Sequence, residues 1–248
     1  MKKGCIIIPC FNEAKNIARV IDELSPFSES LEIVVINDAS TDRTSEAARE
    51  TGKATVLDLP ANLGVGGAVQ TGLRHAEKAG ASWAIKLDGD GQHPPSAIRD
   101  LLEPIISGQA DIVVGSRFLV DNSGFRSSFI RRIGIRFFEY LCLLLTGKRF
   151  TDPTSGFRAY NKATIRFMAR NYPTFDYSEP EELVLASKSG LTIKETPVIM
   201  RERWSGESTI SSTISVYYML KVTLAMLFIY LRKADKPGKS EADRCSLE

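Results

Sequence analysis

Apolar runs alternate with helical segments along the first half of the chain. Five short runs rich in isoleucine, valine and leucine have the composition of buried strands: residues 5–9, 31–36, 54–59, 83–87 and 111–116. The segments between them predict helices, at residues 14–24, from Ser40 and Thr41 toward Gly52, and at residues 65–80 and 95–108. Continuous apolar strands separated by helices predict an α/β fold, with a Rossmann-like, mostly parallel sheet covered by helices on both faces.

The pattern changes after Phe118. Two helices, one strand and two loops are expected there: helices at 126–145 and 179–190, a strand at 191–200, and polar, turn-rich loops at 151–160 and 201–209. A strongly apolar segment follows at residues 214–231. The chain is therefore expected to divide into a main domain at residues 1–210, an apolar helix at 211–233 and a flexible tail at 234–248.

The apolar C-terminal segment bears on where the protein works. Its uninterrupted part, residues 222–231, is too short to cross a bilayer, which takes roughly 20 residues. We expect a helix that lies at a membrane interface or packs on a membrane-protein partner through residues 214–233. The basic residues that follow, beginning with Arg232 and Lys233, would then lie near anionic headgroups. A helix buried in the core or in a homo-oligomer interface is the alternative.

Composition and charge set limits on function. The 248 residues are 43% apolar and 25% charged, and 32 basic against 30 acidic residues leave a net charge of +2, which does not indicate a nucleic-acid partner. Two histidines and four scattered cysteines lack zinc-site spacing, so free thiols in a reducing compartment are expected. Only Ile6 to Ile8 separate the basic N-terminus from Pro9, too short a run for a secretory signal, and the cytoplasm is expected.

Two carboxylates, Asp88 and Asp90, follow the strand expected at residues 83–87. Ligands of parallel sheets bind beyond the carboxyl ends of the strands, where such side chains converge. A hard cation such as Mg²⁺ binds one or two carboxylates together with phosphate oxygens and water, and Gln92 would add a neutral oxygen. The alternative is a solvated acidic turn.

Two further motifs lie near expected strand ends. Asp38 follows the second strand, where it can accept hydrogen bonds from a base or ribose or serve only as a helix cap. Gly64, Gly66 and Gly67 open the next helix, and they predict either a phosphate cradle or close backbone packing.

Charged residues of the second half complete the candidates. Guanidinium groups bind phosphate through two hydrogen bonds, so several arginines would suit a diphosphate or a phosphate acceptor: Arg117, Arg131, Arg132, Arg158 and Arg203. Glu181 and Glu182 open a helix, where they complement the helix dipole or provide a catalytic base.

Eight ordered segments resemble glycosyltransferase family 2: IIIPCFNEAKNI, VVINDASTDRT, NLGVGGAVQTGL, KLDGDGQHPP, VGSRF, DPTSGFRAY, IKETPV and RERWSGEST. The resemblance spans about residues 4–210 and points to the polyprenyl-phosphate (dolichol-phosphate mannose synthase-like) branch. It implies the GT-A fold and transfer of a sugar from a UDP- or GDP-sugar, with inversion at the anomeric carbon.

The resemblance also implies roles for matching residues. The nucleotide would be bordered by Pro9, Asn12, Glu13, Asn62 and Gly64, and its base or ribose would contact Asp38. Asn37 stands where the family usually has another aspartate. Mg²⁺ or Mn²⁺ would be held by Asp88, Asp90 and Gln92. Catalysis would involve Asp88, Asp90, Glu181 and Arg117, and the diphosphate or the acceptor phosphate would be faced by Arg117, Arg131 and Arg203. Arg158, from its loop position, is a further candidate for binding the acceptor phosphate.

The acceptor is open between two chemistries. A polyprenyl phosphate, such as dolichyl or undecaprenyl phosphate, is ionised near neutral pH and needs no strong base. A saccharide hydroxyl in cell-envelope polysaccharide synthesis would need one, and Glu181 is then the candidate. A non-catalytic nucleotide-sugar-binding subunit is the third possibility. We expect the lipid acceptor, and therefore a peripheral protein at the cytoplasmic face of the membrane.

Overall fold

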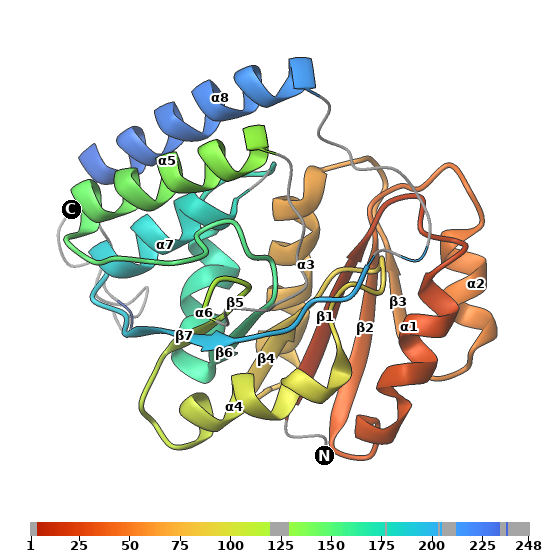
Figure 1. Cartoon of the computed structure of the whole chain (residues 1–248). Coiled ribbons are helices and arrows are strands. Elements are labelled where there is room, and N and C mark those ends of the chain that lie inside the picture. The colour runs from red at the N-terminus through yellow and green to blue at the C-terminus, as the bar shows by residue number, and fades with distance from the viewer. Residues whose placement is uncertain are drawn as a thin grey trace, which may run out of the picture.

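The described part of the chain is built around one seven-stranded sheet (Figure 1). The computed structural model describes residues 4–119, 129–176, 178–202, 204, 212–233 and 237, without the side chains of residues 129–131 and 212–216. The strand order is β3-β2-β1-β4-β6-β5-β7. The strands are β1 (Gly4–Cys10), β2 (Leu31–Asn37), β3 (Thr55–Asp58), β4 (Trp83–Lys86), β5 (Ile112–Ser116), β6 (Arg158–Asn161) and β7 (Ile193–Pro197).

The sheet is mostly parallel. Strand β1 pairs in parallel with both β2 and β4, β2 with β3, and β5 with β7. Strand β6 lies between β4 and β5 and is antiparallel to both. The carboxyl ends of β1, β2 and β4 therefore meet at one edge of the sheet.

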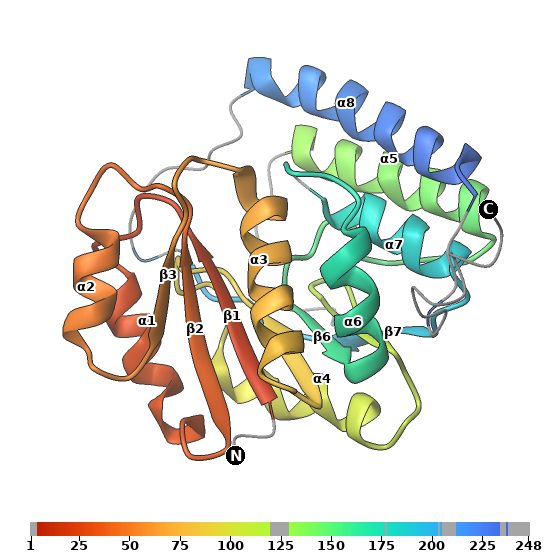
Figure 2. The same ribbon diagram turned by 180° about the vertical axis from the view of Figure 1, so that it is seen from behind.

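Helices cover both faces, as Figures 1 and 2 show. One face is covered by α1 (Ile17–Leu24), α2 (Thr44–Glu50) and α4 (Ile98–Ile106), with 3₁₀ turns at Ser25–Phe27 and Pro95–Ala97. The other is covered by α3 (Gly64–Lys78), α6 (Lys162–Asn171) and α7 (Glu179–Lys188). Outside α7, α5 (Phe129–Thr146) and α8 (Ser212–Leu231) lie side by side. The expected mostly parallel sheet with helices on both faces is confirmed.

The two halves of the core follow from the alternation of side chains along buried strands. In β1, Cys5 and Ile7 contact the α3 side, whereas Ile6 and Ile8 contact the α1 side. Both sets are apolar because both faces of a parallel sheet are covered.

Two elements were missed in the sequence. The expected loop at 151–160 runs into β6, and a helix, α6, follows it directly. Strand β6 has four residues, and its first, Arg158, is a charged residue that is fully buried. A short strand that begins with a buried charge has no apolar periodicity, so its pattern does not indicate a strand.

Helix α8 belongs to the same core as the sheet. Val222 and Met226 are buried among side chains of the α3 side, and the ring of Tyr218 meets Phe138 of α5 edge to face, with 5.7 Å between ring centroids. Among the described residues, no helix is long and apolar enough to cross a membrane.

Candidate active site

Polar residues gather at the carboxyl edge formed by β1, β2 and β4. Pro9 lies near the end of β1, and Asn12 and Glu13 follow that strand. Asp38 follows β2, and the loop that contains Asp88 follows β4. Because β1 pairs with both β2 and β4, these loops are adjacent, as expected from the sequence.

The loop after β4 presents its two carboxylates differently. The side chain of Asp88 is 41% exposed, whereas Asp90 is only 3% exposed. One oxygen of Asp90 accepts a hydrogen bond from the backbone N–H of Gln92, at 3.0 Å. Gly91 between them has a φ of 80°, a conformation that favours glycine. Asp90 therefore helps to fold the loop, and Asp88 is the more accessible of the pair.

His93 is a buried, neutral imidazole that supports this loop. The backbone N–H of Asp88 donates to Nδ1 of His93 at 2.9 Å, and the imidazole stacks on Phe157 with 4.7 Å between centroids. Burial lowers the pKa of His93 to about 4. Since Nδ1 accepts that hydrogen bond, His93 positions Asp88 and does not offer this nitrogen to a ligand.

The segment after β7 lies against the same loop. The ring of Trp204 covers Gly91, where a Cβ would lie 2.5 Å from the indole, and the guanidinium of Arg19 lies 3.9 Å from the centre of that indole. The backbone N–H of Arg201 donates to the carbonyl of Gln92 at 2.9 Å. The sequence predicts only a polar loop here, because nothing in it shows which segment the tryptophan would cover.

The loops after β1 and β2 are tied together through Asn12. Its backbone N–H donates to Oγ of Ser40 at 3.0 Å, and its Oδ1 accepts from the N–H of Thr41 at 2.8 Å. The N–H of Glu13 donates to Oγ1 of Thr44 at 2.8 Å. Asn12 has a φ of 58°, so these hydrogen bonds maintain a backbone conformation that few residues adopt.

Asp38 joins these loops to the start of α3. Its carboxylate accepts a hydrogen bond from the N–H of Leu63 at 2.7 Å, and Asn62 donates to its carbonyl at 3.2 Å. Burial raises the pKa of Asp38. Asn37, at the position where the family usually has an aspartate, donates to Asp58 at 2.8 Å. Asp38 thus organises the edge where the nucleotide was expected.

The glycines at the start of α3 serve close packing. The N–H groups of Gly66 and Gly67 donate to the carbonyl of Phe175, at 2.7 and 3.3 Å. A Cβ on Gly64 would lie 2.1 Å from a carboxylate oxygen of Asp176. Of the two interpretations of this motif, backbone packing is the one that these contacts support, because the two amide groups already have partners.

Arg117 is held by an acidic partner. Its Nε and Nη2 each lie 2.6 Å from a carboxylate oxygen of Asp152, and Nη2 also donates to Oγ1 of Thr154 at 2.9 Å. Both charged side chains are buried. The pair fastens the end of β5 to the loop before β6. A direct role of Arg117 at a diphosphate stays a prediction.

Arg158 corrects the expectation of an accessible phosphate-binding arginine. It is fully buried, with Nη1 3.2 Å from Glu182 and Nη2 donating to the carbonyl of Glu179 at 2.8 Å. Lys86 is buried beside it and pairs with the Glu179 carboxylate at 2.6 Å. Buried cations require such partners, so Arg158 joins β6 to α7 and does not face an acceptor.

Glu181 and Glu182 are both buried at the start of α7, in different surroundings. Glu182 pairs with Arg158 and accepts a hydrogen bond from the hydroxyl of Tyr172 at 3.0 Å. Burial raises the pKa of Glu181 to about 9, and its Oε2 has no hydrogen-bond partner. Glu181 is therefore protonated near neutral pH.

Two expected arginines cannot be placed. The side chain of Arg131, in α5, and the whole of Arg203 lie outside the described residues. Their roles at an acceptor phosphate stay predictions.

The acid loop fits a hard divalent cation. Asp88, Asp90 and Gln92 provide carboxylate and amide oxygens, which Mg²⁺ and Mn²⁺ accept. Within the described ranges, no three His, Cys, Asp or Glu side chains gather as a metal site. A cation here would take its other ligands from a diphosphate and water.

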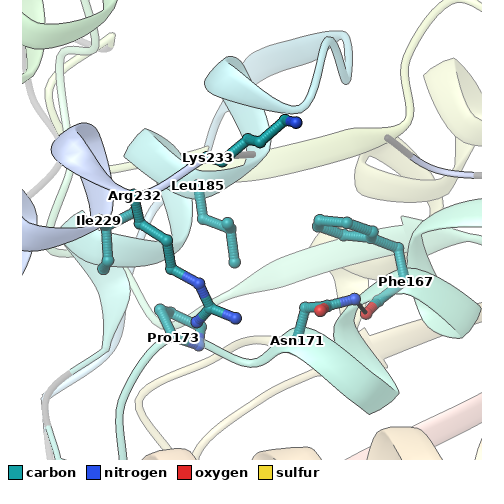
Figure 3. Close-up of a pocket in the computed structure, with 7 residues that line it drawn as sticks. All are labelled: Phe167, Asn171, Pro173, Leu185, Ile229, Arg232 and Lys233. Carbon is teal, nitrogen blue, oxygen red and sulfur yellow. Dashed lines mark hydrogen bonds between the residues drawn. The ribbon is translucent and has the colours of Figure 1, made fainter. Parts of the chain in front are cut away.

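A small pocket lies away from this edge, between α6, α7 and the end of α8 (Figure 3). It is lined by Phe167, Asn171, Pro173, Leu185, Ile229, Arg232 and Lys233. None of these residues belongs to the carboxyl edge, so this pocket is separate from the candidate site.

The family model for Glycosyl transferase family 2 matches residues 5–169, a span that contains the carboxyl edge and the acid loop. The chain belongs to glycosyltransferase family 2. It shares 30% identity over 210 residues with the UDP-N-acetylglucosamine–dolichyl-phosphate N-acetylglucosaminyltransferase of Methanococcus voltae, covering 78% of this chain and 83% of that protein. It is 28% identical over 223 residues to the undecaprenyl-phosphate mannosyltransferase of Micrococcus luteus, covering 88% of this chain and 91% of that protein.

These relatives confirm the resemblance of this family 2 chain to the polyprenyl-phosphate branch. Glucosyl-3-phosphoglycerate synthase from Mycobacterium tuberculosis, solved in complex with Mn²⁺, UDP and phosphoglyceric acid, has the same fold, with a TM-score of 0.71 at 19% identity. The likeness covers 94% of this chain and 80% of that one. The expected GT-A fold is thereby confirmed.

Proposed function

We propose that this family 2 chain transfers a sugar from a UDP- or GDP-sugar to a polyprenyl phosphate. The observation that carries the proposal is the acid loop, with Asp88 and Asp90, at the carboxyl edge of β1, β2 and β4 in a chain whose relatives are named for dolichyl and undecaprenyl phosphate. The proposed place of action is the cytoplasmic face of the membrane, as a peripheral protein.

The proposed donor site uses the three loops of the carboxyl edge. Asn12 and Asp38 would border the nucleoside, and Asp88, Asp90 and Gln92 would hold Mg²⁺ or Mn²⁺ against the diphosphate. When bound, such a cation stabilises the negative charge that develops on the leaving diphosphate. His93 and Trp204 support this loop, so its geometry does not depend on the ligand alone.

The proposed reaction is an inverting displacement. An acceptor phosphate oxygen attacks the anomeric carbon from the side opposite the diphosphate. A new carbon–oxygen bond forms while the bond to the diphosphate oxygen breaks, and that oxygen leaves with the electron pair. Arg131 and Arg203 are the proposed partners of the acceptor phosphate, because guanidinium matches its geometry.

The state of Glu181 supports a phosphate acceptor. A carboxyl group with a pKa of about 9 holds its proton near neutral pH, so it does not remove a proton from a hydroxyl there. A polyprenyl phosphate is already ionised and needs no base. Transfer to a saccharide hydroxyl would instead require Glu181 to lose its proton on binding.

Transfer of labelled sugar from a panel of UDP- and GDP-sugars to polyprenyl phosphate tests the proposal. We expect product with Mg²⁺ or Mn²⁺ and none with EDTA. Asp90→Asn should lower the rate by about 10²-fold or more, as for loss of an electrostatic catalytic group. Asp100→Asn, an exposed acid of α4, is the matched control and should leave the rate unchanged.

Three outcomes would contradict the proposal. Full activity in Asp90→Asn would remove the metal role. Product formed only with a saccharide acceptor, and lost in Glu181→Gln, would favour the hydroxyl chemistry. Nucleotide-sugar binding in a thermal-shift panel with no transfer to any acceptor would favour a non-catalytic subunit.

A further inference from the structure

The outer surface of α5 and α8 is unusually apolar. Of the 19 large apolar side chains exposed among the described residues, 12 belong to these two helices. On α5 they include Ile133, Phe137, Tyr140 and Leu144, and on α8 Tyr217, Leu220, Leu224, Leu227, Phe228 and Leu231. On α5 these positions are three or four residues apart, and on α8 the same spacing holds except for the neighbours Leu227 and Phe228, so each set forms one stripe along its helix.

The two stripes lie on neighbouring helices. In Figures 1 and 2, α5 and α8 lie side by side as the outermost layer on the side of the sheet that carries α3 and α6. Their inner sides are already used, because Phe138 of α5 and Val222 and Met226 of α8 are buried in the core. The exposed stripes are therefore not the faces that hold the helices on the protein. We call this surface the α5–α8 face.

Positive charge accompanies the α5–α8 face. Arg132 and Arg136 are exposed one turn apart on α5. Arg232 and Lys233 are exposed directly after α8, where they also line the pocket between α6, α7 and that end of the helix. Helix α8 contains no acidic residue, and the one acid of α5, Glu139, is paired with Arg149 at 2.7 Å. An apolar stripe bordered by cations matches the interface of a bilayer that contains anionic lipids.

The α5–α8 face also adjoins the donor edge. Lys221 of α8 pairs with Asp176 at 2.6 Å, and the carboxylate of Asp176 lies against Gly64 at the start of α3. The same α3 terminus carries Leu63, whose N–H is bound by Asp38. A lipid bound at this face would therefore lie beside the loops that border the proposed donor site.

We propose that the α5–α8 face docks on an anionic lipid bilayer, with the apolar stripes in the headgroup region and the cations against the lipid phosphates. The inference rests on the proposed function, because docking would bring the donor site to an acceptor held in the membrane. A second copy of the chain fits less well, because joining two such faces would bring their arginines together. Because the stripes run along both helices, the proposed docking places α5 and α8 parallel to the bilayer surface.

Vesicle flotation without any substrate tests this proposal. The full chain should float with vesicles of phosphatidylcholine mixed with phosphatidylglycerol, bind phosphatidylcholine alone more weakly, and lose binding to the mixed vesicles as salt is raised. Leu144→Glu combined with Leu224→Glu should weaken binding by about tenfold or more, since two inserted apolar side chains are replaced by charges. The double variant Arg132→Glu with Arg136→Glu should weaken binding to the vesicles that contain phosphatidylglycerol. Its binding to vesicles of phosphatidylcholine should not change.

Ile106→Glu is the matched control, because Ile106 of α4 is 68% exposed on the opposite side of the sheet. It should float like the unmodified chain. Unchanged flotation of the Leu144 and Leu224 variant, with thermal melting that shows it folded, would overturn the proposal. So would a stable dimer of the unmodified chain that does not float. Since no sugar donor is present, normal flotation with failed sugar transfer would reject only the proposed function.

Discussion

Two adjacent carboxyl groups at the start of α7, those of Glu181 and Glu182, are both buried but have different partners. Glu182 faces the guanidinium of Arg158 and the hydroxyl of Tyr172, so its charge is matched. Glu181 has an oxygen without a hydrogen-bond partner, and burial raises the pKa of its carboxyl to about 9. Glu181 should therefore make the free energy of unfolding depend on pH in the neutral range.

The folded state keeps the Glu181 proton up to about pH 9, whereas an unfolded glutamate loses it above its ordinary pKa of 4.5. The unfolded state then binds fewer protons, so the free energy of unfolding should fall as the pH rises through this window. Glu181→Gln removes this term. The variant should match the unmodified chain near pH 4.5 and exceed its stability at about pH 8 by on the order of 1 kcal/mol or more, as measured by urea denaturation.

Glu182→Gln, at the next position, is the control, and it should destabilise the protein. It leaves the buried Arg158 without its charged partner, which should cost about 3–5 kcal/mol. A Glu181→Gln variant with the same pH profile as the unmodified chain would show that Glu181 is ionised in the folded protein. An ionised Glu181 could act as a base, so its state would no longer favour a phosphate acceptor over a hydroxyl.

Among the elements, the start of α3 depends on close backbone contact. Gly66 donates to the carbonyl of Phe175, and a Cβ at this position would lie 2.2 Å from the carbonyl oxygen of Thr174. Gly66→Ala should therefore destabilise the fold by about 1–3 kcal/mol through overpacking, measured by urea denaturation. It should also weaken nucleotide-sugar binding, since the same terminus supports Asp38.

Gly134 in α5 is the matched control for that substitution. Among the described residues, a Cβ there would meet only Met219, at 3.9 Å, which is an ordinary contact. Gly134→Ala should stabilise the protein by about 0.5–1 kcal/mol, because alanine loses less backbone entropy in a helix. Equal stability of the two variants would show that residues 174–176 do not press on α3 in solution.

For the whole molecule, α8 is both part of the core and part of the outer surface. Met226 is fully buried, whereas Leu224 on the same helix is 54% exposed. Met226→Ala should cost about 2–5 kcal/mol in unfolding free energy, and Leu224→Ala less than about 0.5 kcal/mol. Similar small effects from both variants would mean that α8 does not pack on α7 in solution. Helix α8 would then be separate from the folded core.

The sequence by itself determined the features that depend on neighbouring residues. The five buried runs of the first half are strands because both faces of a parallel sheet must be apolar, and this leaves a continuous run. The aspartates of the acid loop are recognisable as site candidates because they follow such a run directly. The ordered family motifs then led from these elements to a glycosyltransferase of family 2.

The tertiary structure decided what depends on contacts between distant residues. Strand β6 and the burial of Arg158 require the partner Glu182, which lies in another element. The amides at the start of α3 donate hydrogen bonds to the carbonyl of Phe175, and Trp204 covers Gly91. The partners are far apart in the sequence, so no local sequence pattern predicts these contacts. A buried charge or a close backbone contact is stable only when its partner is present, and the partner is chosen by the fold.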